Sequence, residues 1–145
     1  MRLHTREWGA GERVAVLIHG ISADAGAWSG FAERLAARGW RVIAPDLRDH
    51  GDSPRGAYSL AELAGDVVES MPTGPDLALG HSLGGAVLTK ALPGLAPAHA
   101  VYADPAWKVE MTPAKQAAGR AAIASYSREQ WRSFLPRASE RDLGQ

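Results

Sequence analysis

The chain has 145 residues, enough for one domain with a buried core, and its 46% apolar and 22% charged content is typical of soluble globular proteins. Its 16 basic and 16 acidic residues give a formal net charge of zero, so no overall basic surplus favours binding to nucleic acid or to an anionic membrane. The absence of cysteine excludes disulfides, thiolate catalysis and cysteine-based metal sites.

The first residues contain no apolar core of the kind that directs export, and no stretch approaches the roughly 20 apolar residues of a membrane-spanning helix. We therefore expect a cytoplasmic protein that has no membrane partner.

Short apolar runs alternate with amphipathic stretches through the first half of the chain. The β-branched-rich run 14–18 predicts a buried strand, and apolar residues at helical spacing over 28–36 predict a helix. A second strand is expected over 41–44. The segment 47–58 is rich in Asp, Gly and Pro and is expected to be an irregular loop.

The same alternation continues up to residue 103. A capping box at 59–62 predicts the start of a second helix. A third strand is expected over 77–79, and a helix over 86–92 is expected to break at the prolines of 93–97. Residues 100–103 read as a fourth strand. This order predicts an α/β fold, a mostly parallel sheet with helices on both faces.

A serine lies in a glycine-rich turn between the third strand and the following helix. The residues are Gly80, His81, Ser82, Leu83, Gly84 and Gly85. A strand, a sharp turn and a helix around a serine are typical of the nucleophile elbow of acyl-transfer enzymes. A Cβ on Gly80 or Gly84 is expected to strike the neighbouring strand or helix. The alternative is a serine that merely caps the helix, but a cap does not need glycine on both sides.

Two further motifs accompany this turn in the order seen in one family. His19-Gly20-Ile21 ends the first buried strand, and the run Asp46-Leu47-Arg48-Asp49-His50-Gly51-Asp52-Ser53 follows the second. Together with the serine turn they resemble the α/β-hydrolase family, over roughly residues 8–110. Asp49 stands where that family often has glycine, and Trp28 lies at the family's usual distance from the His-Gly turn.

The resemblance implies a serine hydrolase that acts on an ester, a lactone or a similar acyl bond of a small molecule, without a cofactor or metal. Ser82 is then the nucleophile that forms an acyl-enzyme, and the backbone N–H groups of Ile21 and Leu83 form the oxyanion hole. Trp28 and Trp107 are then pocket-lining residues, although packing onto the sheet explains Trp107 equally well. The resemblance also divides the chain into a hydrolase core, 1–105, and the start of a helical lid, 106–145.

The histidine that should activate the serine has no candidate at the family's position, which is late in a longer chain. Four of the five histidines precede Ser82, and they are His4, His19, His50 and His81. His99 follows Ser82, but it begins the fourth strand, at the wrong end of the sheet. Asp104 is a candidate triad acid, because a minority of the family place an acid after this strand, although Asp-Pro is also common turn chemistry. We therefore expect the N-terminal portion of a hydrolase, inactive alone.

Two alternatives remain open at this stage. The chain could be a non-catalytic binding or interaction module that kept the fold and lost the triad. It could also be one part of a split enzyme whose C-terminal half is supplied in trans, or could self-associate through an exposed sheet edge. A metal held by His19, Asp46 and His50 is disfavoured, because these residues lack a typical ligand spacing.

Overall fold

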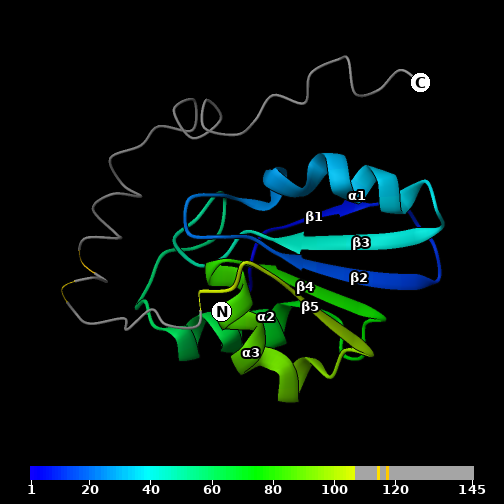
Figure 1. Ribbon diagram of the computed structural model, residues 1–145. Helices are drawn as coiled ribbons and strands as arrows, with labels where there is room; N and C mark the ends of the chain where they lie inside the picture. The colour runs from blue at the N-terminus through cyan, green and yellow to red at the C-terminus, as the bar shows by residue number, and fades with distance from the viewer. Residues whose placement is uncertain (107–113, 115–116, 118–145) are drawn as a thin grey trace.

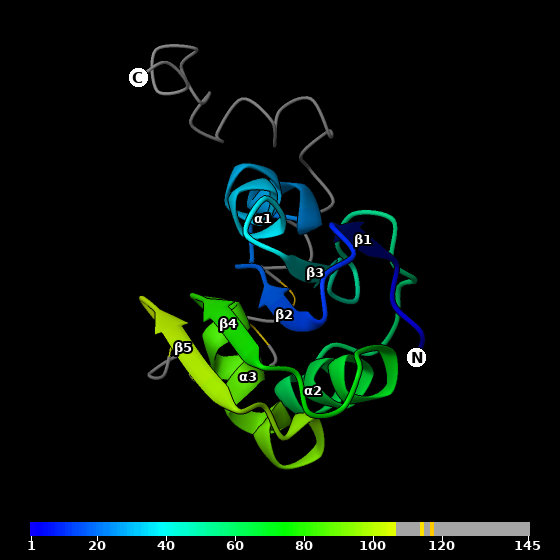
Figure 2. The same ribbon diagram turned by 90° about the vertical axis from the view of Figure 1, so that its right-hand side faces the viewer.

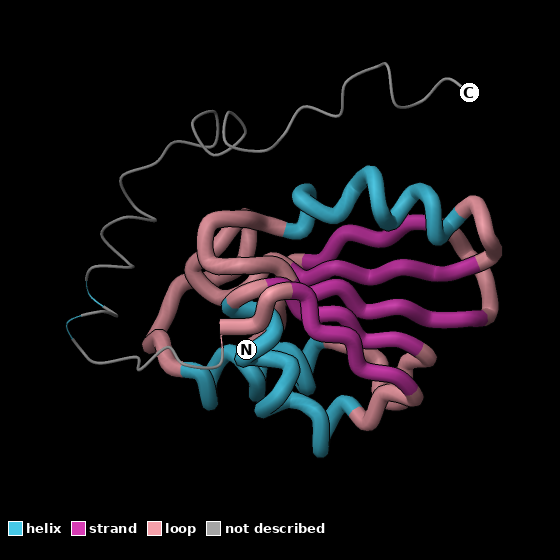
Figure 3. The backbone as a smooth tube through the Cα atoms, in the orientation of Figure 1, coloured by secondary structure: helices cyan, strands magenta, loops and turns pink. Residues whose placement is uncertain are grey.

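A five-stranded sheet with helices on both faces forms the described part of the chain, residues 1–106, 114 and 117 of a computed structural model (Figures 1 and 3). The expected lid over 106–145 lies outside the described residues apart from 106, 114 and 117, and so does Trp107. The α/β architecture predicted from the alternating pattern is confirmed.

The sheet has the strand order β1-β3-β2-β4-β5, in which β1 is antiparallel to β3 and the other neighbours are parallel. Parallel pairing places the carboxyl ends of β2, β3, β4 and β5 at one edge of the sheet. The loops that follow these strands therefore meet there. The strands are β1 (Thr5–Trp8), β2 (Arg13–Ile18), β3 (Trp40–Pro45), β4 (Leu77–His81) and β5 (His99–Ala103).

Helices cover both faces, with α1 on one side and α2 and α3 together on the other (Figure 2). A short 3-10 helix, η1, leads into α1. None of the helices in the described ranges is both long and apolar enough to cross a membrane. The helices are η1 (Ala25–Trp28), α1 (Ser29–Ala36), α2 (Leu60–Ser70) and α3 (Leu83–Leu95).

Alternate side chains of β2 enter two different cores. Val16 and Ile18 belong to the core beneath α2 and α3, whereas Ala15 and Leu17 belong to the core beneath α1. All four are fully buried. This explains why β2 reads as a continuous apolar run, which is typical of a parallel strand covered on both faces.

Two details differ from the sequence prediction. The antiparallel edge strand β1 was not predicted, because Thr5-Arg6-Glu7-Trp8 carries charges and forms its hydrogen bonds with one neighbour only. Pro93 does not break α3, which continues to Leu95 and ends at Ala96 in the left-handed conformation. Pro93 lies in the last turn of α3, and Leu95 of the same turn is buried.

Candidate active site

Ser82 occupies a sharp, strained turn between β4 and α3. Its φ of 50° and ψ of −116° lie in a region that L-residues rarely adopt. Although Ser82 is the N-cap residue of α3, its side chain forms no capping hydrogen bond. The helix-cap alternative therefore does not account for this serine. A strained, non-glycine backbone of this kind is typical of functional turns.

The glycines around Ser82 are required by close backbone contacts, as predicted. A Cβ on Gly80 would lie 2.4 Å from the carbonyl oxygen of Gly84, and a Cβ on Gly84 would lie 2.2 Å from the carbonyl oxygen of Ile18. These atoms belong to the backbone and cannot move aside. The glycines allow α3 to start directly against the end of β2.

Backbone hydrogen bonds hold Ser82 beside the end of β5. Its N–H donates to the carbonyl of Ala103 at 3.1 Å, and its carbonyl accepts from the N–H of Ala106 at 3.0 Å. The last pair in the β4–β5 register is His81 with Ala103, so Ser82 and Asp104 each follow by one residue. Asp104 is exposed and has a φ of 45°. The structure thus brings Asp104 to the same edge as Ser82.

The turn after β2 lies against the serine. A Cβ on Gly20 would be 3.3 Å from the Cβ of Ser82, which places the Gly20–Ile21 peptide beside the elbow. Within the described residues, the N–H groups of Ile21 and Leu83 donate no hydrogen bond to the protein. Leu83 is the first residue of α3, so its N–H is among those left free by the helix and carries the positive end of the helix dipole.

The ring of His19 fixes the direction of the Ile21 N–H. Its Nδ1–H donates to the carbonyl of Gly20 at 2.7 Å, and its Nε2 accepts from the N–H of Leu47 at 2.9 Å. In a trans peptide the C=O and N–H point in opposite directions, so holding the Gly20 carbonyl directs the Ile21 N–H away from His19. Burial, and then the charge of neighbouring His50, lower the pKa of His19 to about 3. His19 is therefore a neutral anchor whose ring nitrogens are both occupied.

The other histidines of the described residues do not form a hydrogen bond with Ser82. His50 has both ring nitrogens against backbone carbonyls, and His4 bonds to Asp46. His99 pairs with Leu77 at the opposite end of β4, as predicted from the sequence.

An open cavity of about 360 Å³ lies beside the elbow, lined mainly by small or apolar side chains. Gly20 and His81, which both adjoin Ser82, form one wall, and Trp28 forms part of another. This volume is at the lower end of the range for small-molecule sites. The lining residues are His19, Gly20, Ser22, Ala23, Ala27, Trp28, His81 and Ala103.

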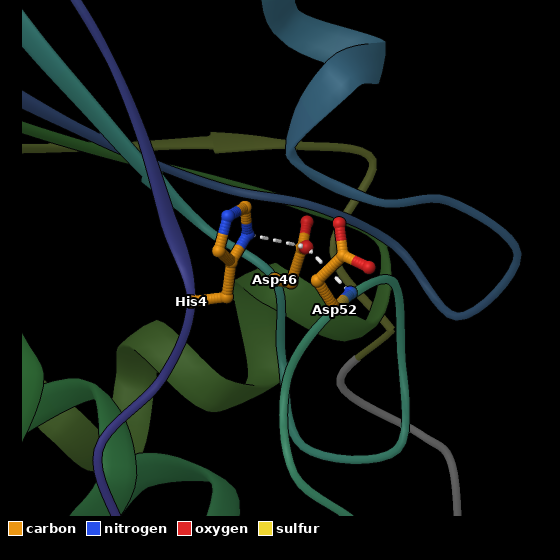
Figure 4. Close-up of side chains that lie close together, drawn as sticks. All are labelled: His4, Asp46 and Asp52. Atoms are coloured by element: carbon orange, nitrogen blue, oxygen red, sulfur yellow. Dashed lines mark hydrogen bonds and ion pairs between the residues drawn. The ribbon is translucent and has the colours of Figure 1, made fainter.

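The Asp46 carboxylate connects three segments of the chain, and Figure 4 shows its contacts with His4 and Asp52. It is fully buried and accepts from the N–H of Ala25 at 2.7 Å, the N–H of Asp52 at 2.9 Å and the ring of His4 at 2.9 Å. One ligand-type atom from each of His4, Asp46 and Asp52 lies within 4.8 Å of the others. Both Asp46 oxygens already accept protein donors, so this group is explained as a structural hydrogen-bond centre. Sequence reasoning missed the His4 contact because 42 residues separate it from Asp46.

A buried ion pair holds the 47–58 loop on α2. The Arg48 guanidinium donates to both carboxylate oxygens of Asp66, from Nε at 2.6 Å and from Nη2 at 2.9 Å. Burial alone would raise the pKa of Asp66, but the hydrogen bonds from Arg48 and the Met1 ammonium outweigh it, and the pKa is lowered. In the same loop, Asp49 has a φ of 66°, which is the conformation that glycine favours at this position.

The sequence matches the alpha/beta hydrolase family over residues 15–144. It is 44% identical over 92 residues to the pimeloyl-[acyl-carrier protein] methyl ester esterase of Methylococcus capsulatus, which covers 63% of this chain and 35% of that enzyme. It is 35% identical over 85 residues to the monoacylglycerol lipase of Mycolicibacterium smegmatis, covering 52% of this chain and 30% of the lipase.

Solved structures show the same arrangement. A thioesterase domain from the curacin biosynthetic pathway superposes with a TM-score of 0.64 and 29% identity, over 81% of this chain and 47% of that domain. An esterase from a marine microorganism superposes with a TM-score of 0.69 and 23% identity, over 87% of this chain and 52% of the esterase. The chain thus spans about half of these structures and about a third of the two curated enzymes. With its parallel sheet, strained serine turn and matching sequence, this chain belongs to the alpha/beta hydrolase family.

Proposed function

We propose that this chain is the nucleophile-bearing part of a serine hydrolase that cleaves an ester, a lactone or a similar acyl bond. The observation that carries the proposal is the strained Ser82 turn, whose hydroxyl caps no helix and which adjoins two unused backbone N–H groups. The names of the relatives support the acyl class, since they are esterases, a lipase and a thioesterase.

In the proposed reaction the Ser82 hydroxyl oxygen attacks the carbonyl carbon of the substrate and loses its proton to a general base. The carbonyl π bond opens, and the negative oxygen accepts hydrogen bonds from the N–H groups of Leu83 and Ile21. Collapse of this intermediate expels the alcohol, which takes up the proton, and leaves an ester on Ser82. Water then hydrolyses that ester by the same steps. Each oxyanion donor is worth about 3 kcal/mol of the barrier.

The general base is proposed to come from outside the described residues. His19 is excluded because its neutral ring already donates to the Gly20 carbonyl and accepts from the Leu47 N–H. Asp104 follows β5 by one residue and is proposed as the acid that orients the base. The Asp104→Asn variant of an active, longer enzyme should lose turnover while keeping its folded structure.

The missing groups are proposed to arrive with strands that pair along β5. Among the described strands, β5 pairs with β4 alone, and its Val101 is 43% exposed. Unpaired strand edges bind other strands readily. Because the chain spans about half of its solved relatives, we propose that the C-terminal half of such a hydrolase is the partner, in the same polypeptide or in trans.

A fluorophosphonate probe tests this proposal, because it forms a P–O bond to an activated serine as fluoride leaves. We expect slow labelling of the isolated chain, and fast labelling once the C-terminal half is added. The Ser82→Ala variant should not be labelled under either condition. Labelling of the Ser82→Ala variant to the same extent as the native chain would refute the role of Ser82. Fast, stoichiometric labelling of the isolated chain would refute the need for a partner. A ligand that binds the native chain and the Ser82→Ala variant with equal affinity, without a partner, would instead favour a binding module.

A further inference from the structure

The Gly20–Ala23 turn lies beside Ser82 but is poorly held by side-chain burial. The Ile21 side chain is 38% exposed, and that of Ser22 is exposed as well. One backbone hydrogen bond closes the turn, from the Ala23 N–H to the Gly20 carbonyl at 3.2 Å. The position of the turn must therefore depend on polar contacts to its carbonyl groups.

A second histidine provides such a contact. His50 is only 4% exposed, and its Nε2 lies 2.8 Å from the carbonyl oxygen of Ile21. Its Nδ1 lies 2.9 Å from the carbonyl oxygen of Arg48. Both partners are carbonyl oxygens, which only accept hydrogen bonds. A neutral imidazole has one N–H, so only the doubly protonated ring donates to both.

Several ionisable side chains surround His50. The neighbouring His19 ring, 5.0 Å away between centroids, stays neutral because its Nε2 must accept from the Leu47 N–H. The guanidinium of Arg48 is paired with Asp66 and Glu62 of α2. The rings of His19, after β2, and of Tyr58, before α2, lie 5.0 Å and 6.2 Å from the His50 ring between centroids, and the charged residues of the same segment are Asp46, Arg48, Asp49 and Asp52.

We propose that His50 is a positioning residue that ties the Ile21 carbonyl to the 47–58 loop and so holds the oxyanion turn against Ser82. The oxyanion role of this turn rests on the proposed function. His19 fixes the Gly20–Ile21 peptide, and His50 fixes the next peptide, Ile21–Ser22. Two histidines from different segments thereby determine the direction of successive peptide units.

Two substitutions at this one position separate the proposed tie from simple packing. The amide of His50→Gln reaches as far as Nε2, so this variant can still donate to the Ile21 carbonyl. The shorter amide of His50→Asn corresponds to Nδ1 and can donate only to Arg48. Both variants lose the ring and its contact with His19, so each is the matched control for the other.

Nuclear magnetic resonance on the isolated chain tests the proposal without using the reactivity of Ser82. We expect the Ser22 amide to shift in His50→Asn and the Asp49 amide to shift in His50→Gln, because each variant loses the donor to one of the two carbonyls. Order parameters of the Ile21 and Ser22 amides should be about 0.85 in the native chain and in His50→Gln, and below about 0.6 in His50→Asn.

The proposal is overturned if the turn stays rigid in His50→Asn, or if both variants loosen the turn equally. If neither variant folds, the native chain decides: order parameters of the Ile21 and Ser22 amides below about 0.6 would overturn it. A chain that shows the tie but is never labelled at Ser82 would refute the proposed function and leave the tie intact.

Discussion

Replacing Gly84 with alanine should weaken the fold at the point where α3 meets β2. The new Cβ would lie 2.2 Å from the Ile18 carbonyl oxygen and 2.7 Å from that of His19. Relieving the clash requires α3 to move by about 1 Å, and overpacking of this kind costs about 3 kcal/mol. Alanine returns about 1 kcal/mol through its higher helix propensity. We therefore expect the free energy of unfolding to fall by about 2 kcal/mol.

The Gly65→Ala variant is the matched control. Gly65 lies in the exposed part of α2, and a Cβ there would meet no atom within 4 Å. The same substitution should therefore raise the free energy of unfolding by about 0.5–1 kcal/mol. Urea denaturation followed by circular dichroism measures both. If Gly84→Ala proved as stable as Gly65→Ala, the proposed contact between α3 and β2 would be wrong.

Three further changes test the groups around the turn. Burial lowers the pKa of His19 to about 3 from 6.5, so between these values the unfolded chain binds a proton that the folded chain does not. The free energy of unfolding should therefore fall by about 1.4 kcal/mol per pH unit as the pH drops below about 6.5. In urea denaturation at several pH values, the His19→Gln variant should lack this contribution to the pH dependence. The Arg48→Met variant leaves the buried Asp66 carboxylate without its main partner, so the free energy of unfolding should fall by about 3 kcal/mol. An unchanged midpoint of thermal or urea unfolding would show that this ion pair does not stabilise the fold. The Asp46→Asn variant replaces one acceptor oxygen, so one of the backbone N–H groups that bond to Asp46 loses its partner and the free energy of unfolding should fall by about 2 kcal/mol. Faster hydrogen exchange at the Ala25 or Asp52 amide would identify the lost hydrogen bond.

Much of the fold follows from local pattern. The β2 run is apolar at every position because both faces of the strand are covered, and the capping box at Ser59 starts α2 where predicted. The edge strand β1 escaped prediction because its residues alternate weakly and its pairing partner lies more than thirty residues away. Pro93 was misread because a proline inside a helix disturbs the turn before it without ending the chain's helical path, and the buried Leu95 lies in the turn that continues.

The sequence by itself determined the family, the position of the serine turn and the two glycines that this turn requires, because these features depend on neighbours in the chain and on backbone sterics. Only the tertiary structure decided which histidine does what. His19 and His50 look alike as residues in glycine-containing turns, yet one is neutral between a carbonyl and an N–H, while the other faces two carbonyls. A histidine's hydrogen bonds are set by the groups that folding brings to its two nitrogens, and all four of these groups are backbone atoms that no sequence motif specifies.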